Sequence, residues 1–368
     1  MPETGVLDEV SFMADKRIIL TGGGTAGHVT PNLALVPRLR ELGFEIFYIG
    51  SYDGIEKGLV EAEGIPYYGI STGKFRRYFD LKNFTDPVRV IKGFNEAASL
   101  IKKLRPDIVF SKGGFVSVPV VLAADRLHVP VICHESDMTP GLANRICIPH
   151  ATRICTSFPE TGASLPEGKS VHTGTPIRAA LLKGDAQRGF AFTGLTPEKP
   201  VILIIGGSQG AASVNAHVRE ILPKLLPQFQ VIHLCGKGKL EEALKGTEGY
   251  VQYEYIQDEL KDLFAMSDLI ISRAGANAIF ELLALAKPNL LIPLSKNASR
   301  GDQILNARSF EKQGFSVVLE EEEITPDKLF SAIQNLYQNR ETYIRTMQAG
   351  VLGDPVKAVI ELIRETVK

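Results

Sequence analysis

Each half of the chain begins with the same pattern, an apolar strand that runs directly into glycines and then into a helix. Residues 17–21 lead into a first glycine turn, 22–27, and residues 201–205 lead into a second glycine turn, 206–210. Such a turn gathers free backbone N–H groups and the positive end of a helix dipole, which together attract phosphate. Glycine is required because a side chain would keep the backbone away from the phosphate oxygens. The pattern predicts two α/β units, each with an anion-binding turn.

Apolar runs alternate with amphipathic stretches along the rest of the chain, which is typical of parallel sheets covered by helices on both faces. In the first half the expected strands are 18–20, 45–49, 107–110, 129–133 and 153–156, and the expected helices are 32–42, 88–104 and 119–127. In the second half the expected strands are 201–205, 230–235, 251–255, 269–272, 288–293 and 316–319, with a helix over 278–285. We therefore expect an α/β fold with two Rossmann-like domains that face each other across a cleft.

The length of 368 residues also suits two domains. The stretch 175–199 mixes prolines, glycines and charges and is the expected linker. We expect residues 1–15 to be a disordered extension, 16–174 to form an N-terminal domain and 175–352 a C-terminal domain. The last helix, 353–368, is expected to return to the N-terminal domain.

Composition excludes several classes of protein. The net charge of −1 argues against nucleic-acid binding, which usually needs a strongly basic domain. No apolar run reaches the length of about 18 residues that suggests a membrane span, and the first dozen residues lack the features of a signal peptide. The cysteines (Cys133, Cys147, Cys155 and Cys235) show no CxxC spacing and are expected to be buried thiols.

The first glycine turn matches the G-x-G-x-x-G fingerprint of dinucleotide-binding proteins, so an NAD-dependent oxidoreductase is one alternative. That fingerprint expects an acidic residue at the end of the second strand, where Asp53 arrives late. A dehydrogenase also has no need of a second glycine turn in its other half. Two such turns suit a nucleotide sugar and its acceptor better, while a plain tight turn between strand and helix remains the structural alternative.

His28 follows the first glycine turn and is the candidate general base, because a helix N-terminus favours the neutral imidazole that accepts a proton. Glu135 and Asp137, in the polar cluster 134–137 that ends the strand 129–133, compete for that role. Ligands of open α/β sheets bind at the carboxyl ends of strands, where this cluster lies. The chain has neither HExxH nor DxD spacing, so we expect chemistry without a metal, in which loop amides and cations stabilise the leaving group.

In the second half, small residues after the strand 269–272 open a helix and suggest a phosphate or ribose neighbour. Glu281 lies one turn inside that helix, where its carboxylate could accept both ribose hydroxyls. A solvated helix residue is the equally simple interpretation of Glu281.

Residues 74–94 combine six cations with five aromatic side chains and two acids. Cations interleaved with aromatics suit docking to an anionic membrane surface. An ordinary surface with its aromatics turned inward is the alternative, and RNA binding is disfavoured by the net charge. The predicted docking residues are Lys74, Phe75, Arg76, Arg77, Tyr78 and Phe79.

Seven motifs resemble the MurG-type transferases in order and spacing over roughly residues 16–365. They are GGGTAGHVTPNLAL, KGGFVSVP, HESDMTPGLAN, GTPIR, GGSQGAASVN, SRAGANAIFE and GDQILNA. The resemblance implies the GT-B fold and a metal-independent, cofactor-free transfer of GlcNAc from UDP-GlcNAc, with inversion, to muramoyl-pentapeptide on undecaprenyl pyrophosphate. That reaction makes lipid II from lipid I for peptidoglycan, at the cytoplasmic face of the bacterial membrane.

The resemblance also implies where the substrates bind, with the donor held mainly by the C-terminal domain. Asp137 is also implied to be a substrate-binding residue. Glu281 would contact the ribose, Gln303 the GlcNAc hydroxyls, and the backbone of Ile256 the uracil. The remaining donor contacts that it implies are Thr25, Ala26, Gly27, Arg178, Ser208, Ala276, Asn277, Ala278, Ile279 and Phe280.

Three residues depart from the family pattern. Asp137 replaces a frequent asparagine, Phe115 a frequent tyrosine, and Asp302 changes the polarity before Gln303. These departures leave the identity of the acceptor open, and a related GT-B transferase that glycosylates diacylglycerol is an alternative. A UDP-GlcNAc 2-epimerase and a non-catalytic nucleotide-sugar-binding protein are two others.

Overall fold

The structure is a computed structural model that describes residues 16–73, 86–207, 210–296, 301–351 and 353–367. The chain divides into two compact units, Met1–Arg178 with Leu352–Lys368 and Ala179–Val351. The first boundary therefore lies at 178 rather than at the expected 174. The reason is that Thr175 shares a hydrogen bond of 2.6 Å with Ser157, which ties the GTPIR stretch to the first unit. The expected extension 1–15 lies outside the described residues.

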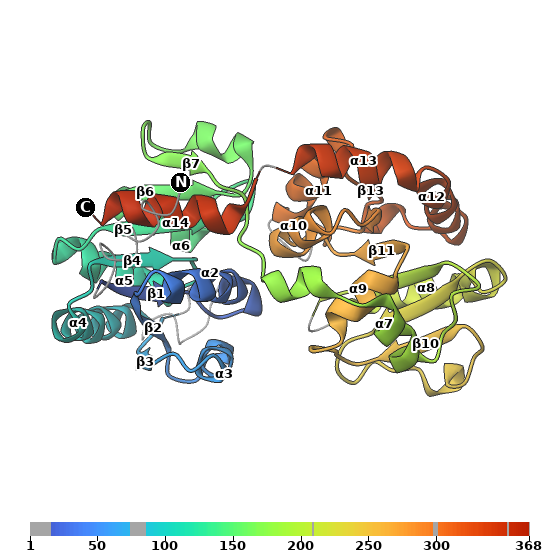
Figure 1. Ribbon diagram of the computed structural model, residues 1–368, viewed down its shortest axis with the longest axis horizontal. Helices are drawn as coiled ribbons and strands as arrows, with labels where there is room; N and C mark the ends of the chain where they lie inside the picture. The colour runs from blue at the N-terminus through green and yellow to red at the C-terminus, as the bar shows by residue number, and fades with distance from the viewer. Residues whose placement is uncertain (1–15, 74–85, 208–209, 297–300, 352, 368) are drawn as a thin grey trace, which may run out of the picture. The chain divides into compact units, whose positions relative to one another are not determined.

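In the described part of the first unit, seven parallel strands form one sheet in the order β3-β2-β1-β4-β5-β6-β7 (Figure 1). The strands are β1 Arg17–Thr21, β2 Glu45–Ser51, β3 Tyr67–Ile70, β4 Ile108–Ser111, β5 Val131–Glu135, β6 Arg153–Thr156 and β7 Ser170–His172. The helices are α2 Thr30–Glu41, α3 Ile55–Ala62, α4 Asp86–Leu104, α5 Ser117–Arg126, α6 Leu142–Cys147 and α14 Pro355–Thr366, with 3-10 turns η1 Ala26–His28, η3 Ile148–His150 and η4 Pro159–Ser164.

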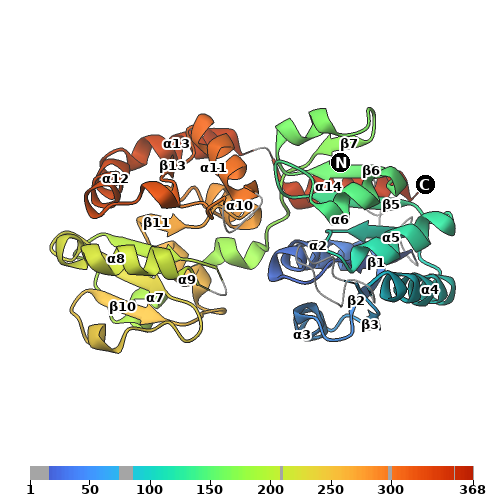
Figure 2. The ribbon, with the colours of Figure 1, turned by 180° about the vertical axis from the view of Figure 1, so that it is seen from behind.

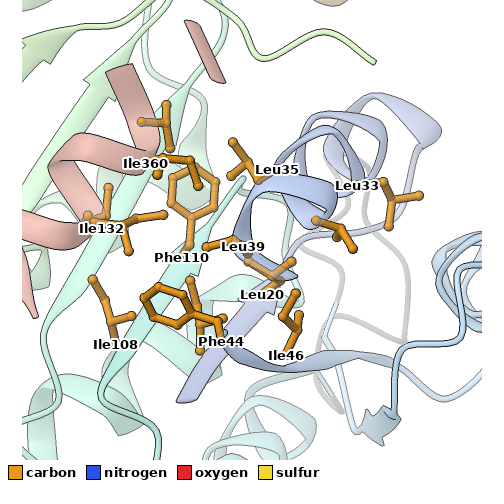
Figure 3. Close-up of a cluster of buried hydrophobic side chains, with 14 of the residues drawn as sticks. Leu20, Leu33, Leu35, Leu39, Phe44, Ile46, Ile108, Phe110, Ile132 and Ile360 are labelled. Atoms are coloured by element: carbon orange, nitrogen blue, oxygen red, sulfur yellow. The ribbon is translucent and has the colours of Figure 1, made fainter. Parts of the chain in front are cut away.

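Both faces of this sheet are buried, because successive strand residues point to opposite sides. Ile18 and Leu20 of β1 pack under α2 and α14, whereas Ile19 packs with α4 and α5. Figure 3 shows Ile360 of α14 beside Phe110 and Ile132 of the sheet. The view from behind in Figure 2 shows α5 and α6 on the other side. The last helix of the chain thus completes the core of the first unit.

The described part of the second unit holds a parallel six-stranded sheet in the order β10-β9-β8-β11-β12-β13. The strands are β8 Val201–Ile205, β9 Gln230–Leu234, β10 Tyr250–Tyr253, β11 Leu269–Ser272, β12 Asn289–Leu291 and β13 Val317–Val318. The helices are α7 Ala186–Thr193, α8 Ala212–Leu225, α9 Leu260–Met266, α10 Ala276–Ala284, α11 Asp302–Lys312, α12 Pro326–Gln338 and α13 Arg340–Gly350, with 3-10 turns η5 Ala179–Lys183, η6 Glu242–Leu244 and η7 Glu321–Glu323.

Each sheet has one strand at which the chain order reverses. In the first unit β1 lies between β2 and β4, and in the second β8 lies between β9 and β11. Ligands of doubly wound sheets bind at the carboxyl end of such a switch strand. The two glycine turns follow β1 and β8 directly. The predicted fold class, two Rossmann-like α/β domains, is confirmed. Within the described residues, no helix has the length and apolar character needed to cross a membrane.

Candidate functional site

The first glycine turn folds tightly against its own helix and against a neighbouring one. A Cβ on Gly22 would lie 2.4 Å from the His28 carbonyl oxygen, and one on Gly23 would lie 2.6 Å from the Glu56 carboxyl carbon. Gly24 adopts φ +85°, a conformation that favours glycine. These contacts explain the glycines without any ligand. They also place His28 at the carboxyl end of β1.

Glu56 occupies the space beneath this turn. Its side chain is fully buried and accepts hydrogen bonds from the Gly24 N–H at 3.2 Å and from the Ser51 N–H at 2.9 Å. The Ser51 hydroxyl donates a further bond to it. An amide of the first glycine turn is therefore already bound to an anion of the protein. The turn is not the set of bare amides that its sequence suggests, and Glu56 was missed because nothing in the sequence shows that this helix residue points inward.

His28 has one defined tautomer. Its Nδ1 lies 3.2 Å from the Lys112 carbonyl oxygen, which can only accept, so Nδ1 carries the hydrogen and Nε2 keeps its lone pair. Burial, followed by the ammonium of Lys112, lowers the pKa of His28 to about 4. The imidazole is therefore neutral near pH 7 and able to accept a proton. The sequence predicted a neutral histidine from the helix dipole, whereas in the structure burial and a nearby cation lower its pKa.

Lys112 follows β4 and is fully buried. Its ammonium donates to the Ser136 hydroxyl. Burial lowers the pKa of Lys112 to about 8, against the opposing effect of the carboxylates of Glu135 and Asp137. This lysine was not predicted, although a cation at the carboxyl end of a largely apolar strand was a signal that could have pointed to it.

Glu135 is held by the protein through both carboxylate oxygens. One accepts from the Asp137 N–H at 2.8 Å, and the other accepts from Asn144 Nδ2 at 2.7 Å and from the Gly141 N–H at 3.2 Å. Burial and the neighbouring Asp137 raise the pKa of Glu135 above its ordinary value. These bonds describe a residue that shapes the loop after β5. Asp137, which is partly exposed in that loop, is more accessible than Glu135.

His134 has a structural position. It is fully buried, and its Nε2–H donates to the Gly174 carbonyl at 2.9 Å. The three predicted catalytic residues, His28, Glu135 and Asp137, thus lie in one unit. Lys112, which was not predicted, contacts the loops that carry them.

The second glycine turn has different surroundings. Gly210 closes the turn by donating to the Gly207 carbonyl at 2.9 Å, and a Cβ on Gly210 would lie 1.9 Å from the Cys235 carbonyl oxygen. The Lys239 ammonium donates to the Gly210 carbonyl at 3.2 Å. The predicted donor contact Ser208 lies outside the described residues.

The helix α10 begins after Gly275 and divides its predicted contacts between two faces. Asn277, Ala278 and Glu281 are partly exposed, whereas Ile279 is fully buried. The Phe280 ring packs edge-on against Phe310 with centroids 5.2 Å apart. Ile279 offers a ligand neither its buried side chain nor its N–H, which donates to the Gly275 carbonyl at 3.1 Å. Ala276, at the first turn, offers an amide at the positive end of the helix.

The side chain of Arg273, which precedes this helix, forms hydrogen bonds within the protein. It forms two bonds to the Glu321 carboxylate, at 2.8 and 3.0 Å, and Glu321 also accepts from the Ser295 N–H at 3.3 Å. The Arg273 side chain thereby fixes the loops after β11 and β12. Glu321 was not selected by sequence analysis.

The other predicted contacts lie at separate places. In the second unit, Gln303 begins α11 and accepts from the Leu294 N–H at 3.0 Å, and Ile256 is buried just after β10. In the first unit, Thr25 is exposed, and Arg178 is exposed at the end of the unit's first segment. Ala26 and Gly27 are partly buried in η1. The predicted membrane residues 74–79 lie outside the described residues.

Within the described part of the chain, no three His, Cys, Asp or Glu side chains gather as a metal site. The polar groups that remain suited to a ligand are a neutral imidazole with a free lone pair in the first unit, and a helix N-terminus with nearby carboxylate and amide side chains in the second.

Comparison with known proteins identifies the family that the chain matches. Residues 18–156 match the glycosyltransferase family 28 N-terminal domain, and residues 201–363 match the family 28 C-terminal domain. The chain is 61% identical over 353 residues to the UDP-N-acetylglucosamine--N-acetylmuramyl-(pentapeptide) pyrophosphoryl-undecaprenol N-acetylglucosamine transferase of Lachnospira eligens, covering 96% of this chain and 100% of that one. It is 57% identical over 354 residues to the Clostridium perfringens protein of the same name, covering 96% and 99%.

Solved structures agree on the fold. The crystal structure of Acinetobacter baumannii MurG matches with a TM-score of 0.76 at 26% identity, covering 95% of this chain and 99% of that one. A putative UDP-N-acetylglucosamine 2-epimerase from Listeria monocytogenes matches with a TM-score of 0.70 at 15% identity, covering 95% and 96%. The second likeness shows a shared fold alone.

Proposed function

The chain belongs to glycosyltransferase family 28 and, within it, to the UDP-N-acetylglucosamine--N-acetylmuramyl-(pentapeptide) pyrophosphoryl-undecaprenol N-acetylglucosamine transferases, and from this membership we propose its reaction. It transfers GlcNAc from UDP-GlcNAc to the lipid-linked muramoyl-pentapeptide, converting lipid I to lipid II. The observation that carries the proposal is the 61% identity to such a transferase over nearly the whole of both chains.

The proposed mechanism is a single displacement. The acceptor hydroxyl attacks C1 of the donor sugar from the face opposite UDP, the C1–oxygen bond to UDP breaks, and the configuration inverts. Nε2 of His28 takes the hydroxyl proton, which its fixed tautomer and neutral state support. UDP departs with the electron pair of the broken bond. Asp137 is the alternative base, and the double engagement of Glu135 supports a loop-shaping role for that residue.

The proposed donor contacts lie mainly in the second unit. The N-terminus of α10 faces the diphosphate with the backbone amides of Ala276, Asn277 and Ala278, because a helix start stabilises negative charge. Ile279, whose N–H donates to the Gly275 carbonyl, and Phe280, which packs on Phe310, hold this turn in place. Glu281 accepts the ribose hydroxyls and Gln303 reads the sugar hydroxyls. The proposed set is completed by Ser208, the backbone of Ile256, Arg178, and Thr25, Ala26 and Gly27.

The deciding experiment varies the acceptor. Purified protein is incubated with labelled UDP-GlcNAc and a lipid I analogue, diacylglycerol or no acceptor, and the products are identified by mass spectrometry. Transfer to the lipid I analogue alone is expected. Transfer to diacylglycerol, or an epimerised donor in the arm without acceptor, would replace the proposed reaction with another. A parallel arm with EDTA tests metal independence, and loss of turnover there would contradict it.

We also propose that the protein docks on the anionic cytoplasmic face of the membrane. Residues 74–79 carry the cations and aromatics that suggest this. In the adjoining helix α4, Arg89 and Lys92 are exposed, and Ile91 is 63% exposed. Flotation with vesicles of anionic or zwitterionic lipid tests the proposal. Salt-sensitive binding to the anionic vesicles alone is expected, and equal recovery without lipid would contradict it.

A further inference from the structure

Lys112 is a buried cation whose two ends contact two different parts of the first unit. It follows β4 at the strand switch, and its side chain is fully buried. Its carbonyl oxygen lies 3.2 Å from Nδ1 of His28, after β1, whereas its ammonium donates to Ser136, after β5. A Cβ on Gly22 would lie 3.2 Å from the Lys112 Cβ, so the residue packs directly beneath the first glycine turn.

Charged groups from several elements face these two side chains. Lys112 is close to Glu135 and Asp137 around the end of β5 and to the Cys155 thiol of β6, and it also acts on His134. The groups that act on His28 are Lys112 and the buried Glu56 of α3. The cation and the carboxylate act in opposite directions on the imidazole. Burial has the largest effect on the imidazole and lowers its pKa, and the Lys112 ammonium adds to that effect while Glu56 opposes it.

We propose that Lys112 is a positioning residue for the transfer, which fixes the His28 tautomer through its main-chain carbonyl and adds, through its buried ammonium, to the effect of burial in disfavouring the imidazolium. The inference rests on the proposed function in taking His28 as the base. The two actions are separable by mutation, since a side-chain substitution leaves the carbonyl in place. The carbonyl favours the protonated ring, whereas the ammonium disfavours it, so the two ends of Lys112 act in opposite directions on the proton affinity of His28.

The test measures His28 directly, without substrate. Histidine-labelled protein is titrated by NMR as wild type, Lys112→Met and Lys112→Arg, with His28→Gln used to assign the signal. In Lys112→Met the pKa of His28 is expected to rise by about one unit, a tenfold gain in proton affinity. The Nδ1–H tautomer should persist in every variant. Lys112→Arg should keep the low pKa, and His233 of the second unit, whose pKa burial lowers to about 3, should not move.

A second variant protects the test against misfolding, because Lys112→Met leaves two carboxylates without their buried cation. Lys112→Met with Asp137→Asn removes one of those charges and should show the same rise. An unchanged His28 titration in either folded variant overturns the proposal, as does an equal rise in Lys112→Arg.

Turnover supplies the independent readout. Wild-type His28 is protonated at Nε2 only as the pH falls through about 4. The acid limb of the pH–rate profile is therefore expected near that pH. In Lys112→Met that limb should move to higher pH while the KM for UDP-GlcNAc stays unchanged. An acid limb that does not move in the folded variant contradicts the inference. If the wild type transfers no GlcNAc, the proposed function fails, whereas the NMR titration still decides whether Lys112 controls His28.

Discussion

The two glycine turns share a sequence pattern and a position after a switch strand, yet side chains of opposite charge bind their backbones. In the first unit, the Gly24 N–H donates to the buried carboxylate of Glu56. In the second unit, the Lys239 ammonium donates to Gly210, and Arg219 donates to the Lys239 carbonyl at 2.6 Å. A turn of backbone amides attracts an anion only when the charges beside it permit.

The difference separates what the two turns do. The second turn has cations next to it and suits a diphosphate. In the first turn the Gly24 amide is already bound by a carboxylate, and the turn places His28 over the Lys112 carbonyl. Glycine spacing alone does not distinguish these roles, because the deciding side chains come from other elements of each unit.

The largest expected effect comes from the first turn. His28→Ala should lower kcat by about 10²–10⁴-fold, the usual loss when a general base is removed. Its affinity for UDP, measured by calorimetry, should stay at the wild-type value because the proposed donor contacts lie mainly in the second unit. Near wild-type turnover in a folded His28→Ala protein would end the assignment and make the first turn purely structural.

A substitution in the proposed donor site of the second unit should instead weaken UDP binding. Glu281→Gln should weaken UDP binding by about tenfold to a hundredfold, because hydrogen bonds to a charged group contribute about 1.5–3 kcal/mol. The measurement is calorimetric titration with UDP. Glu248→Gln, an exposed position in the same unit, is the matched control and should bind normally. Equal affinities for the two variants would exclude the ribose contact.

Glu56→Gln tests the claim that the first turn is closed by its own anion. The amide can accept fewer of the bonds from Gly24 and Ser51, so unfolding should become easier by about 1–3 kcal/mol. Thermal denaturation measures the loss, with the exposed Glu61→Gln of the same helix as control. UDP affinity should not change. Tighter UDP binding by Glu56→Gln would mean that Glu56 competes with the diphosphate for the amides of the first turn.

The smallest effect is expected at Lys239. Lys239→Met removes a partly buried cation beside the second turn and should weaken UDP binding about threefold, within the range of partly screened ion pairs. Competition binding at two salt concentrations should show a smaller salt dependence for the variant. An identical salt dependence would mean that this cation does not act on the diphosphate.

The central strands of both sheets were predictable because they are continuous apolar runs. Residues 201–205 were expected as a strand and form β8 with the same bounds. The edge strand β3 and the three-residue β7 were not predicted, since short edge strands carry few apolar residues and pair on one side only. The helix α3 was missed as well, although it carries Glu56.

The candidate site was predictable where a motif names a residue, as at His28, and less so where packing creates the environment. Nothing local to Lys112 or Glu56 shows that each is fully buried, because their burial depends on strands and helices distant in sequence. Charges that act through space are therefore the part of the site that required the structure.

The return of α14 to the first unit has a consequence for the order of folding. Val359, Ile360 and Ile363 fill the same core as Leu20 and Phe110. That core stays unfinished until the ribosome has synthesised α14, whereas residues 179–351 form an uninterrupted segment that is complete earlier. A nascent chain can therefore assemble its second unit before its first, and a premature stop within α14 would leave the earlier-made unit with an uncovered apolar strip.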